Sequence, residues 1–146
     1  MVTKKYFQLE FLFGLIVLGV VALDQLLKYL IVYFNPNWDL WILRIHFIQN
    51  TGAGFGILQN QTIWLGLISL IVTLAVIIGY KRIPREKFPQ ILFALFLGGT
   101  IGNLIDRFLR KFVVDFIDFS FWPAFNLADA VITLSVIGLM WYFWKK

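Results

Sequence analysis

Four long apolar segments constrain the fold of this 146-residue chain more than any other feature. Each is close to the roughly 20 helical residues that cross the hydrocarbon core of a bilayer. They cover approximately residues 7–33, 62–80, 88–109 and 126–144. Apolar residues make up 60% of the chain and charged residues 14%, so a small soluble globule could not cover its apolar surface. The sequence therefore predicts one all-α membrane domain with four transmembrane helices.

The basic residues predict the orientation of these helices. Eight lysines and arginines lie at the two termini and between the second and third segments, against four on the other side: Arg44, Arg107, Arg110 and Lys111. Cytoplasmic loops are enriched in basic residues, so we expect both termini in the cytoplasm and residues 35–61 and 110–125 outside. The first segment does not resemble a cleaved signal peptide, because its apolar stretch is long and reaches Asp24 without a small-residue cleavage site.

The residue types present exclude several kinds of chemistry. The chain has no cysteine, so disulfides and thiolate sites are impossible, and its single histidine, His46, cannot build a multi-histidine metal site. The serines have no histidine partner within reach. The basic residues follow the segment ends rather than a nucleic-acid-binding pattern. We therefore expect no metal, no cofactor and no nucleic-acid partner, and carboxylate chemistry if the chain is a hydrolase.

The first outer loop predicts structure of its own. A strand-like run at residues 41–48 is followed by the glycine-rich sequence NTGAGFG at residues 50–56. Glycines at these positions permit tight turns and close backbone approach. We expect a small β-sheet here, outside the membrane.

Five of the eight acidic residues lie in or beside the apolar segments. They are Asp24, Asp106, Asp115, Asp118 and Asp129. Ionisable groups near hydrocarbon are costly, so each needs a partner or a function. Asp24 and Lys28 share one helix face at a spacing of four, which a structural ion pair explains best, although they could also support a polar site.

The third segment ends in a polar stripe. Gly98 and Gly102 form a small-xxx-small pair, which is typical of close helix packing. Asn103, Asp106 and Arg107 then fall on one side of the helix, and a buried hydrogen-bonding network is the simplest interpretation of Asp106.

Asp115 and Asp129 are the strongest catalytic candidates. They lie on consecutive elements near the same outer interface, and two neighbouring carboxylates share one proton, so that one is an acid and the other a base. Two simpler interpretations stay open from the residues alone. Asp129 could stabilise a helix N-terminus capped by Asn126, and Asp115 could be a solvated loop residue like Asp118.

Five segments in order resemble the lipoprotein signal peptidase, or signal peptidase II, family. They are DQLLK at 24–28, NTGAGFG at 50–56, GGTIGNLIDR at 98–107, VVDFI at 113–117 and FNLAD at 125–129. The resemblance implies an aspartic endopeptidase with four transmembrane helices, a small extracytoplasmic β-sheet cradle and a short surface helix. It implies a location in the bacterial cytoplasmic (inner) membrane, with the active site at the outer face.

The resemblance also implies a substrate and a set of site residues. The substrate is a prolipoprotein, cut before its diacylglyceryl-modified cysteine, and membrane lipids and a globomycin-type peptide antibiotic are the other implied partners. Asp115 and Asp129 match the catalytic pair, without a metal. Ten further positions match residues that shape the site or bind substrate: Asp24, Lys28, Asn50, Gly52, Gly102, Asn103, Asp106, Arg107, Asn126 and Ala128.

Two other classes of function stay open. A small proton-coupled transporter would use Asp24 or Asp106 as a relay, although the acids lie toward one face and no paired repeats are visible. A non-catalytic assembly factor would use the glycine faces to hold partner helices. Such a protein would tolerate loss of the two aspartates, whereas a peptidase would not.

Overall fold

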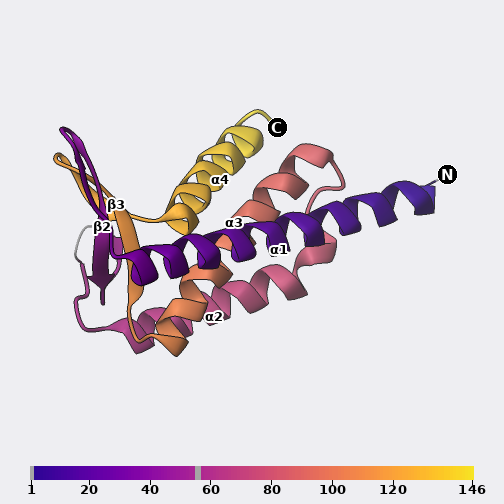
Figure 1. Cartoon of the computed structure of the whole chain (residues 1–146). Coiled ribbons are helices and arrows are strands. Elements are labelled where there is room, and N and C mark those ends of the chain that lie inside the picture. Colours follow the sequence, from indigo (N-terminus) through magenta and orange to yellow (C-terminus); the bar gives the residue numbers. More distant parts are fainter. Residues whose placement is uncertain (1, 55–56) are drawn as a thin grey trace.

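The computed structural model is mostly helical, with a small sheet at one end of a helix bundle (Figure 1). It describes residues 2–54 and 57–146, with side chains from residue 6 onward. The helices are α1 (Val2–Phe34), α2 (Thr62–Ile78), α3 (Lys87–Leu109) and α4 (Leu127–Trp144), with the 3-10 helix η2 (Tyr80–Arg82) between α2 and α3. The strands are β1 (Asn37–Leu40), β2 (Leu43–Asn50), β3 (Val113–Phe119) and β4 (Trp122–Phe125).

Helices α1, α3 and α4 are each long and apolar enough to cross a membrane, whereas α2 is apolar but has only 17 residues. Large apolar side chains such as Phe7, Leu18 and Ile78 are exposed on the outside of the bundle, while charged residues are buried inside it. This distribution suits a hydrocarbon solvent, because lipid accepts apolar side chains and charges turn inward. The chain is a membrane protein.

Helix α3 is the centre of the bundle and packs against α1, α2 and α4. Its glycines make this possible, as the small-xxx-small pattern predicted. A Cβ at Gly98 would lie 2.8 Å from the Val20 Cβ of α1, and one at Gly99 would lie 2.7 Å from the Ala128 carbonyl oxygen of α4. No larger side chain fits at either position, so the helix backbones approach closely on two sides of α3.

The four strands form one antiparallel sheet in the order β1-β2-β3-β4. The predicted strand at residues 41–48 was displaced: Trp41 and Ile42 form a turn, and β2 runs from Leu43 to Asn50. The β2–β3 pairing brings Asn50 opposite Val113, although 63 positions separate them in the sequence. The sheet therefore joins the loop after α1 to the loop after α3, at the ends of α1, α3 and α4. The short surface helix that the family resemblance implies remains a prediction.

Candidate active site

Asp115 is a buried residue of β3, so its interpretation as a solvated loop residue was wrong. Its side chain is 1% exposed, and both oxygens accept hydrogen bonds from asparagine amides. Asn50 Nδ2 donates to Oδ2 at 2.8 Å, and Asn126 Nδ2 donates to Oδ1 at 2.7 Å. A carboxyl group is thus held in one orientation between β2 and the start of α4.

Asp129 lies in the first turn of α4 and faces the same asparagines. Its Oδ1 accepts from Asn103 Nδ2 at 2.7 Å, and its Oδ2 accepts from the Asn126 backbone N–H at 3.2 Å. Asn126 caps the helix, because its Oδ1 accepts from the Asp129 N–H at 3.0 Å. The predicted helix cap is confirmed, and the same reciprocal contacts fix the Asp129 carboxylate.

Asn103 and Asn126 connect the two aspartates. Asn126 Nδ2, which donates to Asp115, also donates to Asn103 Oδ1 at 3.2 Å. Asn103 then presents its own amide N–H to Asp129. Each amide is held by several partners, so neither can flip without losing hydrogen bonds. The structure therefore brings together the two predicted aspartates and two of the predicted supporting residues.

The environment of Asp115 changes its titration. Burial, reinforced by the negative charge of Asp129, raises the pKa of Asp115 from 3.8 to about 7. The Asn50 and Asn126 amides oppose this rise by favouring the charged form, but burial outweighs them. A carboxyl group with such a pKa can hold a proton at neutral pH.

A buried cluster of ion pairs contacts the asparagine that faces Asp129. Lys28 Nζ lies 2.8 Å from Asp24 Oδ2 and 3.1 Å from Asp106 Oδ2, and all three side chains are fully buried. Lys28 Nζ also donates to Asn103 Oδ1 at 2.8 Å. The predicted ion pair of Asp24 with Lys28 and the predicted network at Asp106 are both confirmed. The contact to Asn103 orients the amide that faces Asp129.

Carboxylate oxygens of the cluster also hold the two elements that carry the aspartates. Asp106 Oδ2 accepts from the Val114 backbone N–H at 3.0 Å, one residue before Asp115. Asp24 Oδ1 accepts from the Ala128 backbone N–H at 3.0 Å, one residue before Asp129. The cluster thus ties β3 to α3 and α4 to α1 at the positions where the carboxylates emerge.

Gly102 and Gly52 allow close approach at this site. A Cβ at Gly102 would lie 2.5 Å from Asp24 Oδ2, and one at Gly52 would lie 2.6 Å from the Ile57 carbonyl oxygen. The Gly52 N–H also donates to Asn50 Oδ1 at 2.9 Å, which turns the Asn50 amide nitrogen toward Asp115. At both positions the lack of a Cβ leaves room for a neighbouring oxygen atom, which a larger residue would displace.

Two members of the network were missed from the sequence. Gln25 Nε2 donates to the Gly102 carbonyl and to Asp106 Oδ1, each at 3.1 Å. Arg110 pairs with Asp106 Oδ1 and donates to Gln25 Oε1 at 3.0 Å. The spacing of four between Asp106 and Arg110 could have indicated the pair, as it did for Asp24 and Lys28.

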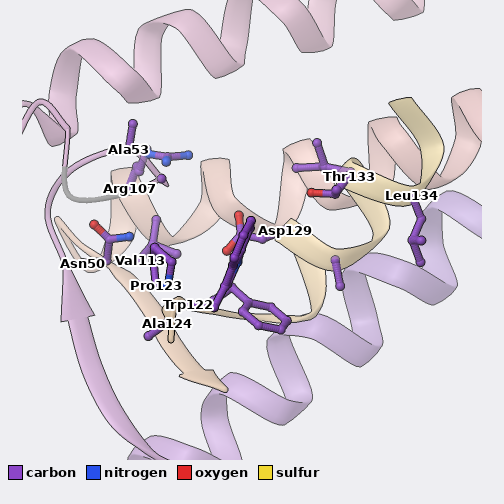
Figure 2. A pocket seen from close by; sticks show the side chains of 14 residues that line it. Asn50, Ala53, Arg107, Val113, Trp122, Pro123, Ala124, Asp129, Thr133 and Leu134 are labelled. Atoms are coloured by element: carbon purple, nitrogen blue, oxygen red, sulfur yellow. The ribbon is translucent and has the colours of Figure 1, made fainter. Parts of the chain in front are cut away.

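A cavity of about 470 Å³ opens beside Asp129 (Figure 2). Its polar lining includes Asn50, Arg107 and Asp129, and its walls are largely apolar, including Trp122 and Phe125. Arg107 Nη1 donates to Ser69 Oγ at 3.3 Å, while its buried Nε has no partner within the described part of the chain. The cavity therefore combines an acid–base group and a cationic donor with apolar walls.

His46 and Asp118 lie away from this cavity. Asp118 Oδ2 contacts Arg44 Nη2 at 2.7 Å and His46 Nε2 at 2.9 Å, which gives both acid and histidine a structural partner. Within residues 2–54 and 57–146, no group of three or more metal-ligating side chains was found.

The fold and the site define a class: a membrane protein with two carboxylates linked through shared asparagines, beside a mainly apolar cavity that Asp129 lines. A model of the signal peptidase II family matches residues 16–145, and the chain belongs to that family. It is an aspartic peptidase of the membrane, which decides against the transporter and assembly-factor alternatives.

Individual relatives agree with this assignment. The chain is 40% identical to a lipoprotein signal peptidase of Moorella thermoacetica over 88% of this chain and 90% of the relative. It is 41% identical to one of Caldanaerobacter subterraneus over 85% of this chain and 90% of the relative. A bacterial membrane enzyme solved in meso at 2.3 Å is similar in structure, with a TM-score of 0.84 and 32% identity over 91% of this chain and 87% of that one.

Proposed function

We propose that Asp115 and Asp129 are the catalytic pair of this peptidase and that they activate a water molecule between them. The observation that carries the proposal is their shared hydrogen bonding through Asn103 and Asn126, beside a cavity large enough for a peptide segment. Both groups are held rigidly, as acid–base catalysis requires.

The hydrogen bonds and the pKa of Asp115 suggest how the proton is divided. Asp115, with its pKa raised to about 7, carries the proton, while Asp129 faces the Asn103 amide and the Asn126 N–H and is the base. Asp129 takes a proton from water as the oxygen attacks the scissile carbonyl carbon. Asp115 gives its proton to the carbonyl oxygen, which leaves a neutral gem-diol. Asp129 then protonates the nitrogen as the C–N bond breaks, while Asp115 takes a proton back from a diol hydroxyl. A carboxylic acid and an amine are released, and the pair regains its starting protonation. The pair titrates as one unit.

Arg107 is a substrate-binding residue in this proposal. It lines the cavity with Asp129, and its guanidinium has a buried nitrogen that Ser69 does not occupy. A permanently charged, forked donor suits a peptide carbonyl group. Asn50 lines the same cavity, and the Gly52 N–H holds the Asn50 side chain in place.

The substrate follows from the family and from the cavity walls. We infer that it is a prolipoprotein, cut before a cysteine that carries a diacylglyceryl group. The apolar walls formed by residues such as Trp122, Phe125 and Leu134 suit an apolar signal-peptide segment or an acyl chain. A globomycin-type peptide would compete for the same walls.

The site would lie at the outer face of the bacterial cytoplasmic membrane. In this arrangement all four helices cross the bilayer and both termini are cytoplasmic, as the basic residues predict. Helix α2 is about 26 Å long at 1.5 Å per residue, so with η2 behind it a slightly thinned or tilted bilayer accommodates it. Water reaches the site from outside, while the lipid-anchored substrate arrives from the membrane.

A cleavage assay on a diacylglyceryl-modified prolipoprotein tests the proposal. The wild type is compared with Asp115→Asn, Asp129→Asn and Asp118→Asn, each checked for normal folding. We expect the first two variants to lose cleavage and Asp118→Asn, whose side chain lies outside the cavity, to retain it. Normal cleavage by either of the first two variants would remove the proposed catalytic pair.

A further inference from the structure

The outer part of the sheet has two chemically different faces. Cross-strand partners in an antiparallel sheet lie on the same face, and neighbours along a strand lie on opposite faces. The pairs Trp38–Ile45, Leu40–Leu43, Ile45–Ile117, Leu43–Phe119, Ile117–Phe125 and Phe119–Trp122 place only apolar residues on one face. We call this set the distal apolar face.

The opposite face is polar. Its pairs are Asn37–His46, Asp39–Arg44 and Arg44–Asp118. Its two acids are engaged, because Asp118 contacts both Arg44 and His46, and Asp39 Oδ1 accepts from the Trp41 backbone N–H at 3.1 Å. The polar face thus presents charged and hydrogen-bonding side chains, which suits contact with water.

Two turns extend the distal apolar face at its outer end. The β1–β2 turn exposes Trp41 by 89%, and the β3–β4 turn exposes Phe121 by 76%. They lie side by side, since the Ser120 N–H donates to the Ile42 carbonyl at 3.2 Å. Figure 1 shows both hairpins projecting from the sheet end of the bundle, away from the N-terminus of α1.

Trp41 has a positive φ angle, which residues with a Cβ rarely adopt. Its φ is 69°, and the Ile42 N–H donates to the Leu40 carbonyl at 2.9 Å, which together make a γ-turn of the rare, strained type. Glycine would relieve this strain, because it has no Cβ. A tryptophan that is both strained and almost fully exposed indicates a role for its ring.

We propose that the distal apolar face and the two turns rest on the bilayer surface beside the bundle, with the polar face turned to water. Tryptophan and other aromatic residues prefer the interface between hydrocarbon and headgroups. The surface continues that of α1, whose outer end exposes Tyr29, Tyr33 and Phe34 three residues before β1 begins. Through β4, the same face leads to Trp122 and Phe125 in the cavity wall.

The absence of cysteine makes the test direct. Single cysteines are introduced as Trp38→Cys, Trp41→Cys and Asn37→Cys, and each is labelled with a polarity-sensitive fluorophore. Asn37 is the matched control, because it neighbours Trp38 on the same strand and faces the other way. The proteins are placed in phosphatidylcholine–phosphatidylglycerol vesicles with nitroxides at the headgroup, the upper acyl chain or the bilayer centre.

We expect labels at positions 38 and 41 to be quenched by upper-chain nitroxides about threefold more than the label at 37, because only one sheet face meets lipid. Equal, water-like emission at all three positions would overturn the proposal. Labels at 38 and 41 that are shielded from water but quenched by no nitroxide would also overturn it, because a second copy of the chain would then cover the face. Shielding that develops only when substrate is added would overturn it too, because the substrate would then cover the face.

The unlabelled protein provides a second measurement if a cysteine variant fails to fold. Brominated lipids should quench wild-type tryptophan fluorescence more than that of Trp41→Phe, and equal quenching would contradict the proposal. Cleavage by every protein is measured in parallel. Cleavage by Asp115→Asn tests the proposed catalytic pair. The fluorescent labels test the lipid contacts separately, because their quenching does not depend on whether the enzyme cleaves its substrate.

Discussion

Replacement of Lys28 by methionine tests whether the buried ion cluster holds the site together. Methionine fills a similar volume but leaves Asp24 and Asp106 facing each other in a fully buried space. Asp24, Asp106, Lys28 and Arg110 carry two negative and two positive charges, so the substitution creates a net charge of −1 among them. Breaking a buried pair by removing one partner costs about 3–5 kcal/mol.

The expected loss can be measured by thermal unfolding in detergent micelles. For a chain of this size, 1 kcal/mol shifts Tm by roughly 2–4 °C, so Lys28→Met should lower Tm by on the order of 10 °C. The double variant Asp24→Asn, Lys28→Met restores the charge balance and should recover part of this loss. The Asn103 amide would still lack its Lys28 donor, so cleavage should remain impaired in the double variant.

Two outcomes would refute this reasoning. A change in Tm of less than about 2 °C in Lys28→Met would mean that the cluster is not paired as the contacts indicate, given the usual cost of an unpaired buried charge. A double variant less stable than Lys28→Met would mean that charge balance is not the reason for the loss. Lys145→Met, at the exposed end of α4, is the control, since its cation lies over the Trp141 ring at the surface.

Three further predictions concern the site. The raised pKa of Asp115, about 7, favours its protonated form in the folded state, so its contribution to stability is present below about pH 4 and is lost as pH rises through 7. The Tm of Asp115→Asn relative to that of the wild type should therefore rise between pH 5 and pH 8, because only the wild type loses this contribution; a Tm difference independent of pH would contradict this expectation. Wild-type cleavage should decline above about pH 7 as the acid loses its proton. Gly102→Ala should cost about 1–3 kcal/mol in unfolding free energy, because the new Cβ would lie 2.5 Å from Asp24 Oδ2, whereas Gly14→Ala, with nothing nearby, should unfold like the wild type. Ser69→Ala removes the hydroxyl partner of Arg107 and should raise KM more than it lowers kcat in steady-state assays; an unchanged KM would argue against Arg107 as a substrate contact.

The helices could be predicted from the sequence because the length and the ends of each apolar segment can be seen in the sequence itself. The ion pair of Asp24 with Lys28 and the cap at Asn126 were equally local, since both depend on residues within four positions of each other. The burial of Asp115 could not be predicted in this way. It depends on β3 pairing with β2 and on Asn50, 65 positions earlier.

The hydrogen bonds between side chains of different helices could not be predicted from the sequence pattern either. Nothing local shows that Asn103 accepts from Lys28 and donates to Asp129, because each of the three residues lies on a different helix. Trp41 was expected in a strand because tryptophan favours strands and disfavours positive φ. The short loop between β1 and β2 overrode that preference.

The cap at the start of α4 also sets when the site can exist. Asn126 begins the helix, holds Asp115 and fixes Asp129, so docking of α4 and assembly of the two carboxylates are one event. Residues 1–125 reach the membrane first during synthesis and bring Asp115 without its partner. If Asp115 and Asp129 are the catalytic pair as proposed, a chain whose α4 has not yet docked on α3 has no assembled acid–base pair and cannot cleave neighbouring membrane proteins.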